Sequence, residues 1–72
     1  SMNDYEIIGW VGFGFISIGY YLNSQKNINC FYVWAIGNII FMLYAYQIES
    51  YPMLIMSLFT LAMNIYGYMK WK

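Results

Sequence analysis

The fold is decided by the stretch YPMLIMSLFTLAMNIYGYMKW, residues 51–71, which is long enough to cross a bilayer and has one charge, near its end. Its interior carries the polar side chains of Ser57, Thr60 and Asn64. Spacings of three and four residues place these side chains on one face of a helix. A helix in hydrocarbon keeps such groups where another part of the protein receives them. The sequence therefore predicts a partner helix or a polar cavity on this face.

The composition indicates that lipid, rather than water, surrounds most of the chain. Of its 72 residues, 62% are hydrophobic and only 8% are charged, whereas soluble domains average about 25% charged residues. A domain this short would also leave much of its apolar surface exposed to water. The formal net charge is zero, so nothing indicates nucleic-acid binding. We expect the lipid bilayer, a small polar solute and a second copy of the chain as partners.

The side-chain chemistry argues against an enzyme. The chain has no histidine and one cysteine, Cys30, which excludes an internal disulfide and a Cys/His metal cluster. Without histidine it also lacks the commonest acid–base catalyst. We expect no catalytic residue, no metal and no cofactor.

Three apolar segments predict an all-α membrane protein, a bundle of three transmembrane helices in a single domain, residues 1–72. We expect helices over about residues 5–22, 31–48 and 52–69. Each is near the lower length limit for a hydrocarbon core of about 30 Å, and the segments lack the alternation of membrane strands. Turn residues separate them at Asn23–Asn27 and Glu49–Pro52, with proline at the start of the third helix.

Charge placement predicts the orientation. In a three-helix topology the acidic residues fall on one side of the membrane, and they are Asp4, Glu6 and Glu49. The lysines fall on the other side, and they are Lys26, Lys70 and Lys72. Because basic residues prefer the cytoplasm, we expect the N-terminus outside and the C-terminus inside. The expected location is the cell membrane, as a multi-pass protein of a bacterial inner membrane.

Two asparagines are candidates for a site within the membrane. Asn38 lies about 10 Å and Asn64 about 8 Å from the predicted cytoplasmic ends of their helices. One interpretation is a hydrogen bond between them, worth about 1–2 kcal/mol. The other is that one or both line a solute path, with Trp34 nearby. The residues alone leave both interpretations open, but the lack of a carboxylate between the rims favours a neutral solute over an ion.

Three helices are too few to enclose a solute path, whereas two copies would provide six. A parallel two-fold homodimer, with its axis along the membrane normal, is the expected assembly. Within each copy, Gly9, Gly12 and Gly19 lie roughly along one side of the first helix. They predict close helix approach, or alternatively a helix relaxed for a rocking motion.

Three short helices, a polar first loop and Pro52 at the head of the third helix resemble the SemiSWEET half-transporters of the SWEET/PQ-loop superfamily. The segments YYLNSQKN, CFYVWAIGN and NIYGYMKW also resemble small relatives of the Pnu-type nicotinamide riboside transporters. The SemiSWEET resemblance implies a homodimer that moves sugar by alternating access. It places Phe41 at the sugar-stacking position, Ser57 at the position of a sugar-binding asparagine, and Tyr44 at the position of a tyrosine near the outer end of the second helix.

The leading hypothesis is a homodimeric, alternating-access facilitator for a small neutral polar solute, with sugar as the first choice. Uptake of nicotinamide riboside or a similar vitamin or nucleoside is the alternative. A second alternative is a small non-transporting membrane subunit whose polar residues only join helices. The candidate solute-binding residues are Phe41, Ser57, Asn64, Asn38, Trp34, Thr60 and Tyr44.

Overall fold

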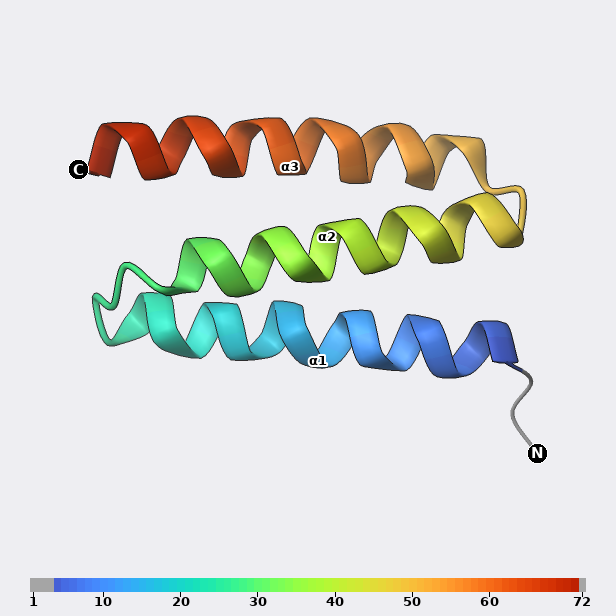
Figure 1. Ribbon diagram of the computed structural model, residues 1–72, viewed down its shortest axis with the longest axis horizontal. Helices are drawn as coiled ribbons and strands as arrows, with labels where there is room; N and C mark the ends of the chain where they lie inside the picture. The colour runs from blue at the N-terminus through green and yellow to red at the C-terminus, as the bar shows by residue number, and fades with distance from the viewer. Residues whose placement is uncertain (1–3, 72) are drawn as a thin grey trace.

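The computed structural model describes residues 4–71, and these residues form three α-helices joined by short turns (Figure 1). The helices are α1 (Asp4–Ser24), α2 (Cys30–Gln47) and α3 (Tyr51–Trp71). The described residues contain no strand. The prediction of an all-α chain with three helices is therefore confirmed, and each helix end lies within two residues of its predicted position.

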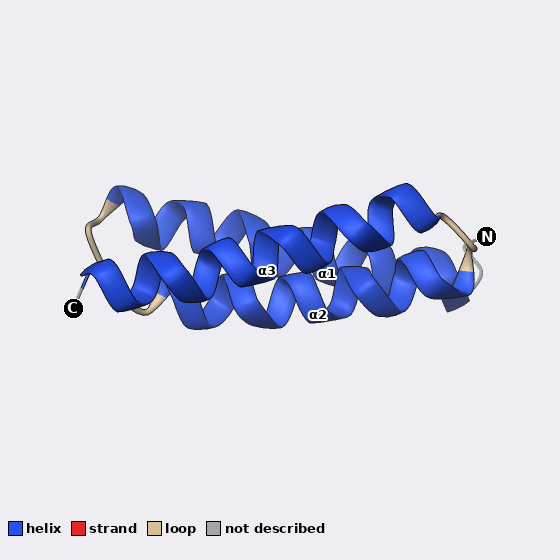
Figure 2. Cartoon of the chain, turned by 90° about the horizontal axis from the view of Figure 1, so that it is seen from above, coloured by secondary structure: helices blue, strands red, loops and turns tan. Residues whose placement is uncertain are grey.

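The three helices lie side by side in one open layer with α2 in the middle. Helix α2 contacts both α1 and α3, but α1 and α3 do not contact each other. The chain measures 40 × 24 × 12 Å, and the smallest dimension is close to the diameter of a single helix, about 10–12 Å. Figure 2 shows the layer turned by 90°. One copy of the chain thus leaves both faces of α2 without a covering helix.

The two turns begin in the same way. Lys26 and Glu49 follow α1 and α2 with left-handed φ values of 56° and 57°. After α1, the N–H of Asn27 donates a 2.9 Å hydrogen bond to the carbonyl of Leu22. A left-handed residue followed by this bond is a Schellman motif, which satisfies the last helical carbonyls and reverses the chain. Neighbouring helices therefore run antiparallel.

Glycines on α1 let α2 approach closely. Gly9, Gly12 and Gly19 all face side chains of α2, whereas Gly14 faces open space. Gly9 faces Tyr44, Gly12 faces Phe41, and Gly19 faces Trp34. A Cβ atom at Gly19 would collide with the indole ring that lies over it. The expectation of close approach along this side of α1 is confirmed.

Helices α2 and α3 are joined by polar contacts near the C-terminal end of α3. The side-chain amide of Asn64 donates a 2.8 Å hydrogen bond to the backbone carbonyl of Phe31. The hydroxyl groups of Tyr32 and Tyr68 form a 2.7 Å hydrogen bond. The ring of Phe31 also lies close to Gly67. These contacts fix the spacing of the two helices at this end.

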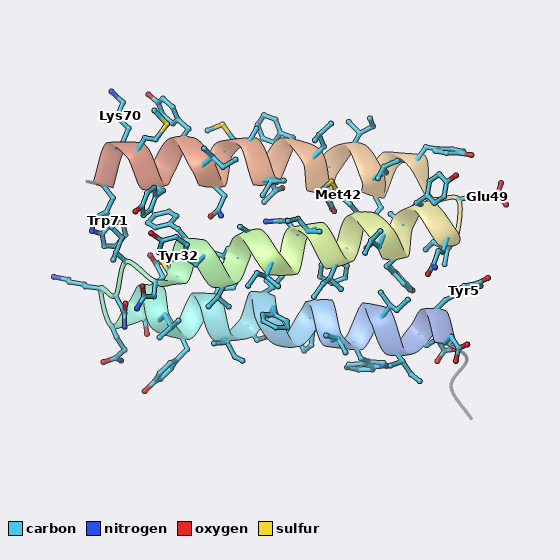
Figure 3. The ribbon with its side chains drawn as sticks, viewed as in Figure 1. Tyr5, Tyr32, Met42, Glu49, Lys70 and Trp71 are labelled. Carbon is cyan, nitrogen blue, oxygen red and sulfur yellow. The ribbon has the colours of Figure 1, made fainter. Side chains whose placement is uncertain are left out.

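The charged residues lie at opposite ends of the layer. Asp4 and Glu6 begin α1, and Glu49 lies in the adjacent turn between α2 and α3. Figure 3 shows Glu49 at one end of the layer and Lys70 at the other. Lys26, in the turn between α1 and α2, lies at the same end as Lys70. Lys72 lies outside the described residues. The orientation prediction rests on this separation of the charges.

Helices α2 and α3 are long and apolar enough to cross a membrane. Helix α1 does not meet the same criterion. At 21 residues, it is nevertheless about 31 Å long, which matches the hydrocarbon core. Large apolar side chains cover the outside of the layer, including Tyr46 and Met69, each 69% exposed. Such a surface suits lipid better than water.

Candidate solute-binding pocket

A pocket of about 440 Å³ lies on one face of the layer, with walls from all three helices. We call it the central pocket. Its aromatic side chains are Tyr20, Phe31, Trp34 and Phe41; its polar side chains are Asn38, Ser57, Thr60 and Asn64; the others are Ile16, Met53, Met56 and Met63. A few polar groups in a mainly apolar hollow of this size are typical of a small-molecule site.

Six of the seven predicted site residues line the central pocket, and Tyr44 does not. The ring of Tyr44 lies against Gly9 of α1, where it lines a separate pocket. Three residues turn a helix by about 300°, so Tyr44 lies beside Phe41 but about 60° further round the helix, toward α1. Tyr44 therefore shares the second pocket with Phe41 and does not reach the central pocket.

Trp34 is held in place on the central pocket by three neighbours. Its indole Nε1–H donates a 3.2 Å hydrogen bond to the carbonyl of Ile16. The ring lies over Gly19, which has no side chain to displace it. Tyr20 packs edge to face against it with ring centroids 5.2 Å apart. The flat indole ring of Trp34 extends from α2 over α1, and Gly19 leaves the space that it occupies.

Asn38 and Asn64 do not bond to each other. Asn38 donates a 3.0 Å hydrogen bond to the carbonyl of Trp34 in its own helix, whereas Asn64 donates to Phe31 of the neighbouring helix. Each amide therefore uses one donor and keeps its carbonyl oxygen. Both residues line the central pocket. No buried polar side-chain atom of the described residues lacks a hydrogen-bond partner, so the two carbonyl oxygens, which have none, are not fully buried. They are therefore accessible to a solute.

Ser57 and Thr60 differ in how their hydroxyl groups are used. Thr60 Oγ1 donates a 2.7 Å hydrogen bond to the carbonyl of Met56 in its own helix. Ser57 is only 5% exposed, yet its hydroxyl makes no hydrogen bond to the rest of the described chain, residues 4–71. Since it lines the central pocket, its Oγ–H is available to a bound molecule. Ser57 thus offers a free donor where Thr60 does not.

Several pocket residues were not predicted from the sequence. Met53, Met56 and Met63 share the helix face of the three polar residues of α3, and the same spacing argument would have found them. Ile16 and Tyr20 of α1 had no such signal, because no polar residue marks that side of α1. Phe31, at the start of α2, was not among the predicted residues either. Its carbonyl, rather than its ring, connects it to Asn64.

A family model described as "Nicotinamide mononucleotide transporter" matches residues 6–72, nearly the whole chain. Neither the search of curated proteins nor the search of solved structures returned a match. The family match supports the predicted membrane transporter and the resemblance to the Pnu-type proteins. It does not support the SemiSWEET assignment, and it favours the nicotinamide alternative over sugar.

Proposed function

The chain belongs to the nicotinamide mononucleotide transporter family, and we propose that it is a half-unit of a membrane transporter that carries a nicotinamide nucleoside. The solute binds in the central pocket. The observation that carries this proposal is a pocket without charged side chains, in which aromatic rings lie beside amide and hydroxyl groups. We propose no chemical step: the protein moves the solute unchanged.

The aromatic walls suit the base of such a solute. Nicotinamide riboside contains a flat pyridinium ring with a positive charge, so this proposal replaces the neutral solute expected from the sequence with an organic cation. Aromatic faces attract organic cations through their quadrupole, and the attraction grows when water is excluded. Trp34 presents the strongest such face, and its orientation is fixed by its bond to Ile16. Tyr20 and Phe41 flank it along the same pocket.

The polar walls suit the remaining groups of the solute. A carboxamide and ribose hydroxyl groups each need donors and acceptors. Asn38 and Asn64 offer carbonyl oxygens and one further N–H each, since each uses a single donor within the protein. Ser57 offers a hydroxyl group. These groups lie on α2 and α3, so a solute held between them contacts both helices.

The charge of the pocket favours a nucleoside over a nucleotide. None of the described residues that line the central pocket is lysine or arginine, the side chains that usually bind phosphate. Lys26 and Lys70 lie at one end of the layer, outside the pocket lining. A phosphate group would lose its hydration without gaining a counter-ion. We therefore propose nicotinamide riboside, rather than the mononucleotide, as the solute.

The open layer argues for a second copy of the chain. The central pocket lies on a face that no other helix of the described chain covers. We propose that two copies associate as a parallel two-fold homodimer with these faces toward each other. Six helices then surround the solute, and rocking of the two halves opens the site to each side of the membrane in turn.

We propose that all three helices cross the cell membrane, with the N-terminus outside and the C-terminus in the cytoplasm. The support is the charge separation: the described lysines lie at the end opposite the three carboxylates. Lysine-bearing ends stay in the cytoplasm during insertion. In a bacterium this membrane is the inner one.

Equilibrium binding tests the solute. The purified protein in lipid nanodiscs is titrated calorimetrically with nicotinamide riboside, nicotinamide mononucleotide, and a mono- and a disaccharide. We expect saturable binding of the riboside, and at least about tenfold weaker binding of the mononucleotide, the equivalent of about 1.4 kcal/mol. Tighter binding of the mononucleotide or of a sugar would contradict the proposed pocket chemistry.

One observation favours a second candidate, a small membrane subunit that does not transport. Asn64 and the Tyr32–Tyr68 pair join α2 to α3, as purely structural polar residues would. The substitution Asn64→Leu separates the two functions. Loss of the dimer with this variant indicates a structural role, whereas a stable dimer without uptake indicates a residue on the solute path.

A further inference from the structure

We propose that a second pocket on the same face, near the start of α1, is a separate binding site for flat organic cations. We call it the Glu6 pocket. It has a volume of about 300 Å³ and is lined by Glu6, Gly9, Trp10, Phe13, Phe41 and Tyr44. Its position on a solute path rests on the proposed function above. The binding itself does not.

Four aromatic side chains line the Glu6 pocket, which is open on the side of α1, where Trp10 is 62% and Phe13 is 55% exposed. Trp10 and Phe13 pack edge to face on α1, with ring centroids 6.0 Å apart and an interplanar angle of 84°. Phe41 and Tyr44 do the same on α2, with centroids 6.3 Å apart and an angle of 73°. Aromatic rings around one hollow attract quaternary and aromatic cations.

Gly9 allows the ring of Tyr44 to lie close to α1. Gly9 is the only lining residue without a side chain, and a Cβ atom there would lie 3.0 Å from Tyr44 Cε1. That distance is too short for the ring to keep its place without moving. The absence of a side chain lets Tyr44 lie against α1 and form one wall of the Glu6 pocket.

The charges around the pocket select cations. Glu6 places a carboxylate at its rim, and Asp4 and Glu49 lie at the same end of the layer. The two lysines among the described residues, Lys26 and Lys70, lie at the far end. A concave site lined by one sign of charge concentrates ligands of the opposite sign. The pocket therefore attracts pyridinium and ammonium groups and repels phosphates.

The Glu6 pocket and the central pocket share a wall. Phe41 lines both of them. On α1, Glu6 and Phe13 line one pocket and Tyr20 the other, and these residues recur every seven positions along one side of the helix. The two pockets are therefore consecutive along a single face. A cation held in the first needs only to pass the ring of Phe41 to reach the second.

Fluorine NMR of the full chain in nanodiscs, labelled with 5-fluorotryptophan, tests this site directly. The three tryptophans, Trp10, Trp34 and Trp71, give three signals, each assigned by a Trp→Phe variant. N-methylpyridinium is the probe because it keeps the charged ring and lacks the ribose and carboxamide. We expect a saturable shift of the Trp10 signal. A Trp10 signal that does not move, or that moves linearly without saturation, overturns the proposal.

Two matched variants distinguish binding at the Glu6 pocket from a general effect of the negative charge at this end of the layer. Glu6→Gln and Glu49→Gln each remove one carboxylate from the same end, but only Glu6 lines the pocket. We expect the apparent Kd read from Trp10 to rise about three- to tenfold in Glu6→Gln and to stay unchanged in Glu49→Gln. Equal effects of the two variants, or none with Glu6→Gln, contradict a local site. An absence of nicotinamide riboside uptake would overturn the transport proposal and leave this titration unaffected.

Discussion

The side-chain amide of Asn64 on α3 donates a 2.8 Å hydrogen bond to the backbone carbonyl of Phe31 on α2. Both residues also line the central pocket. One contact therefore joins two helices and places a polar group in the pocket where we propose that the solute binds. The predicted bond between Asn38 and Asn64 is absent from the described residues, although Asn64 does join two helices, and its place on a solute path stays a prediction.

Replacing Asn64 with leucine should affect both roles. The variant loses the bond to Phe31, which is worth about 0.5–1.5 kcal/mol in a membrane protein, and it removes an amide from the pocket. We expect a small decrease in the unfolding midpoint in detergent and a large loss of uptake. The helix content is followed by circular dichroism during heating. An unchanged midpoint would show that the bond contributes nothing to stability.

The pair Gly19→Ala and Gly14→Ala tests the position of Trp34. A methyl group at Gly19 collides with the indole, whereas one at Gly14 meets no atom within 4 Å. Gly19→Ala should destabilise the fold by about 1–3 kcal/mol and weaken solute binding, because the ring must leave Ile16. Gly14→Ala should preserve both properties. Thermal unfolding and calorimetric binding measure the difference, and equal behaviour of the two variants would contradict this role of Gly19.

Ser57→Ala should raise the KM for uptake without changing stability. The hydroxyl of Ser57 has no partner in residues 4–71, so its removal costs the fold nothing, but the solute loses a hydrogen bond worth about 0.5–1.5 kcal/mol. The corresponding increase in KM is about two- to thirteenfold. Thr60→Ala is the control, since that hydroxyl already bonds to Met56. A larger effect of Thr60→Ala would reverse the assignment.

The proposed dimer is tested by cross-linking across its two-fold axis. Cys30 is fully buried and is first replaced by serine, so that a cysteine introduced at Thr60 is the only thiol. Thr60 lines the open face, and a short bis-maleimide should join two copies in native membranes. The control is a cysteine at Tyr46, which is 69% exposed and outside all three pockets. Cross-linking through Tyr46 and not Thr60 would place the interface elsewhere.

The sequence predicted the helices well because hydrocarbon imposes a simple rule on them. Uncharged stretches must be helical in lipid, and turn residues such as Asn23 and Pro52 mark their ends. The polar side of α3 was equally clear, since Ser57 and Asn64 lie on one face. Spacings of three and four residues on α2 and α3 brought six predicted residues into the central pocket.

The remainder of the site depends on how the helices pack against one another. The spacing of residues within a single helix does not determine this packing. Tyr44 was placed with Phe41 on grounds of resemblance, and the two do share the Glu6 pocket, but only Phe41 also reaches the central pocket, because the ring of Tyr44 lies against Gly9 of α1. Tyr20 joins the site only because α1 lies beside Trp34. The choice of solute had no local signal either: amides and hydroxyl groups fit sugars as well as nucleosides, and the family match, not the residue pattern, favours nicotinamide.

The most direct test of the central claim is uptake of radiolabelled nicotinamide riboside by liposomes that contain the purified protein. We expect saturable uptake that excess unlabelled riboside abolishes and that equimolar nicotinamide mononucleotide or sugar leaves unchanged. The variant Trp34→Ala should reduce this uptake by about tenfold or more, the equivalent of a lost stacking contact of about 1.5 kcal/mol. Riboside uptake no faster than in empty liposomes, or saturable uptake of a sugar instead, would contradict the account.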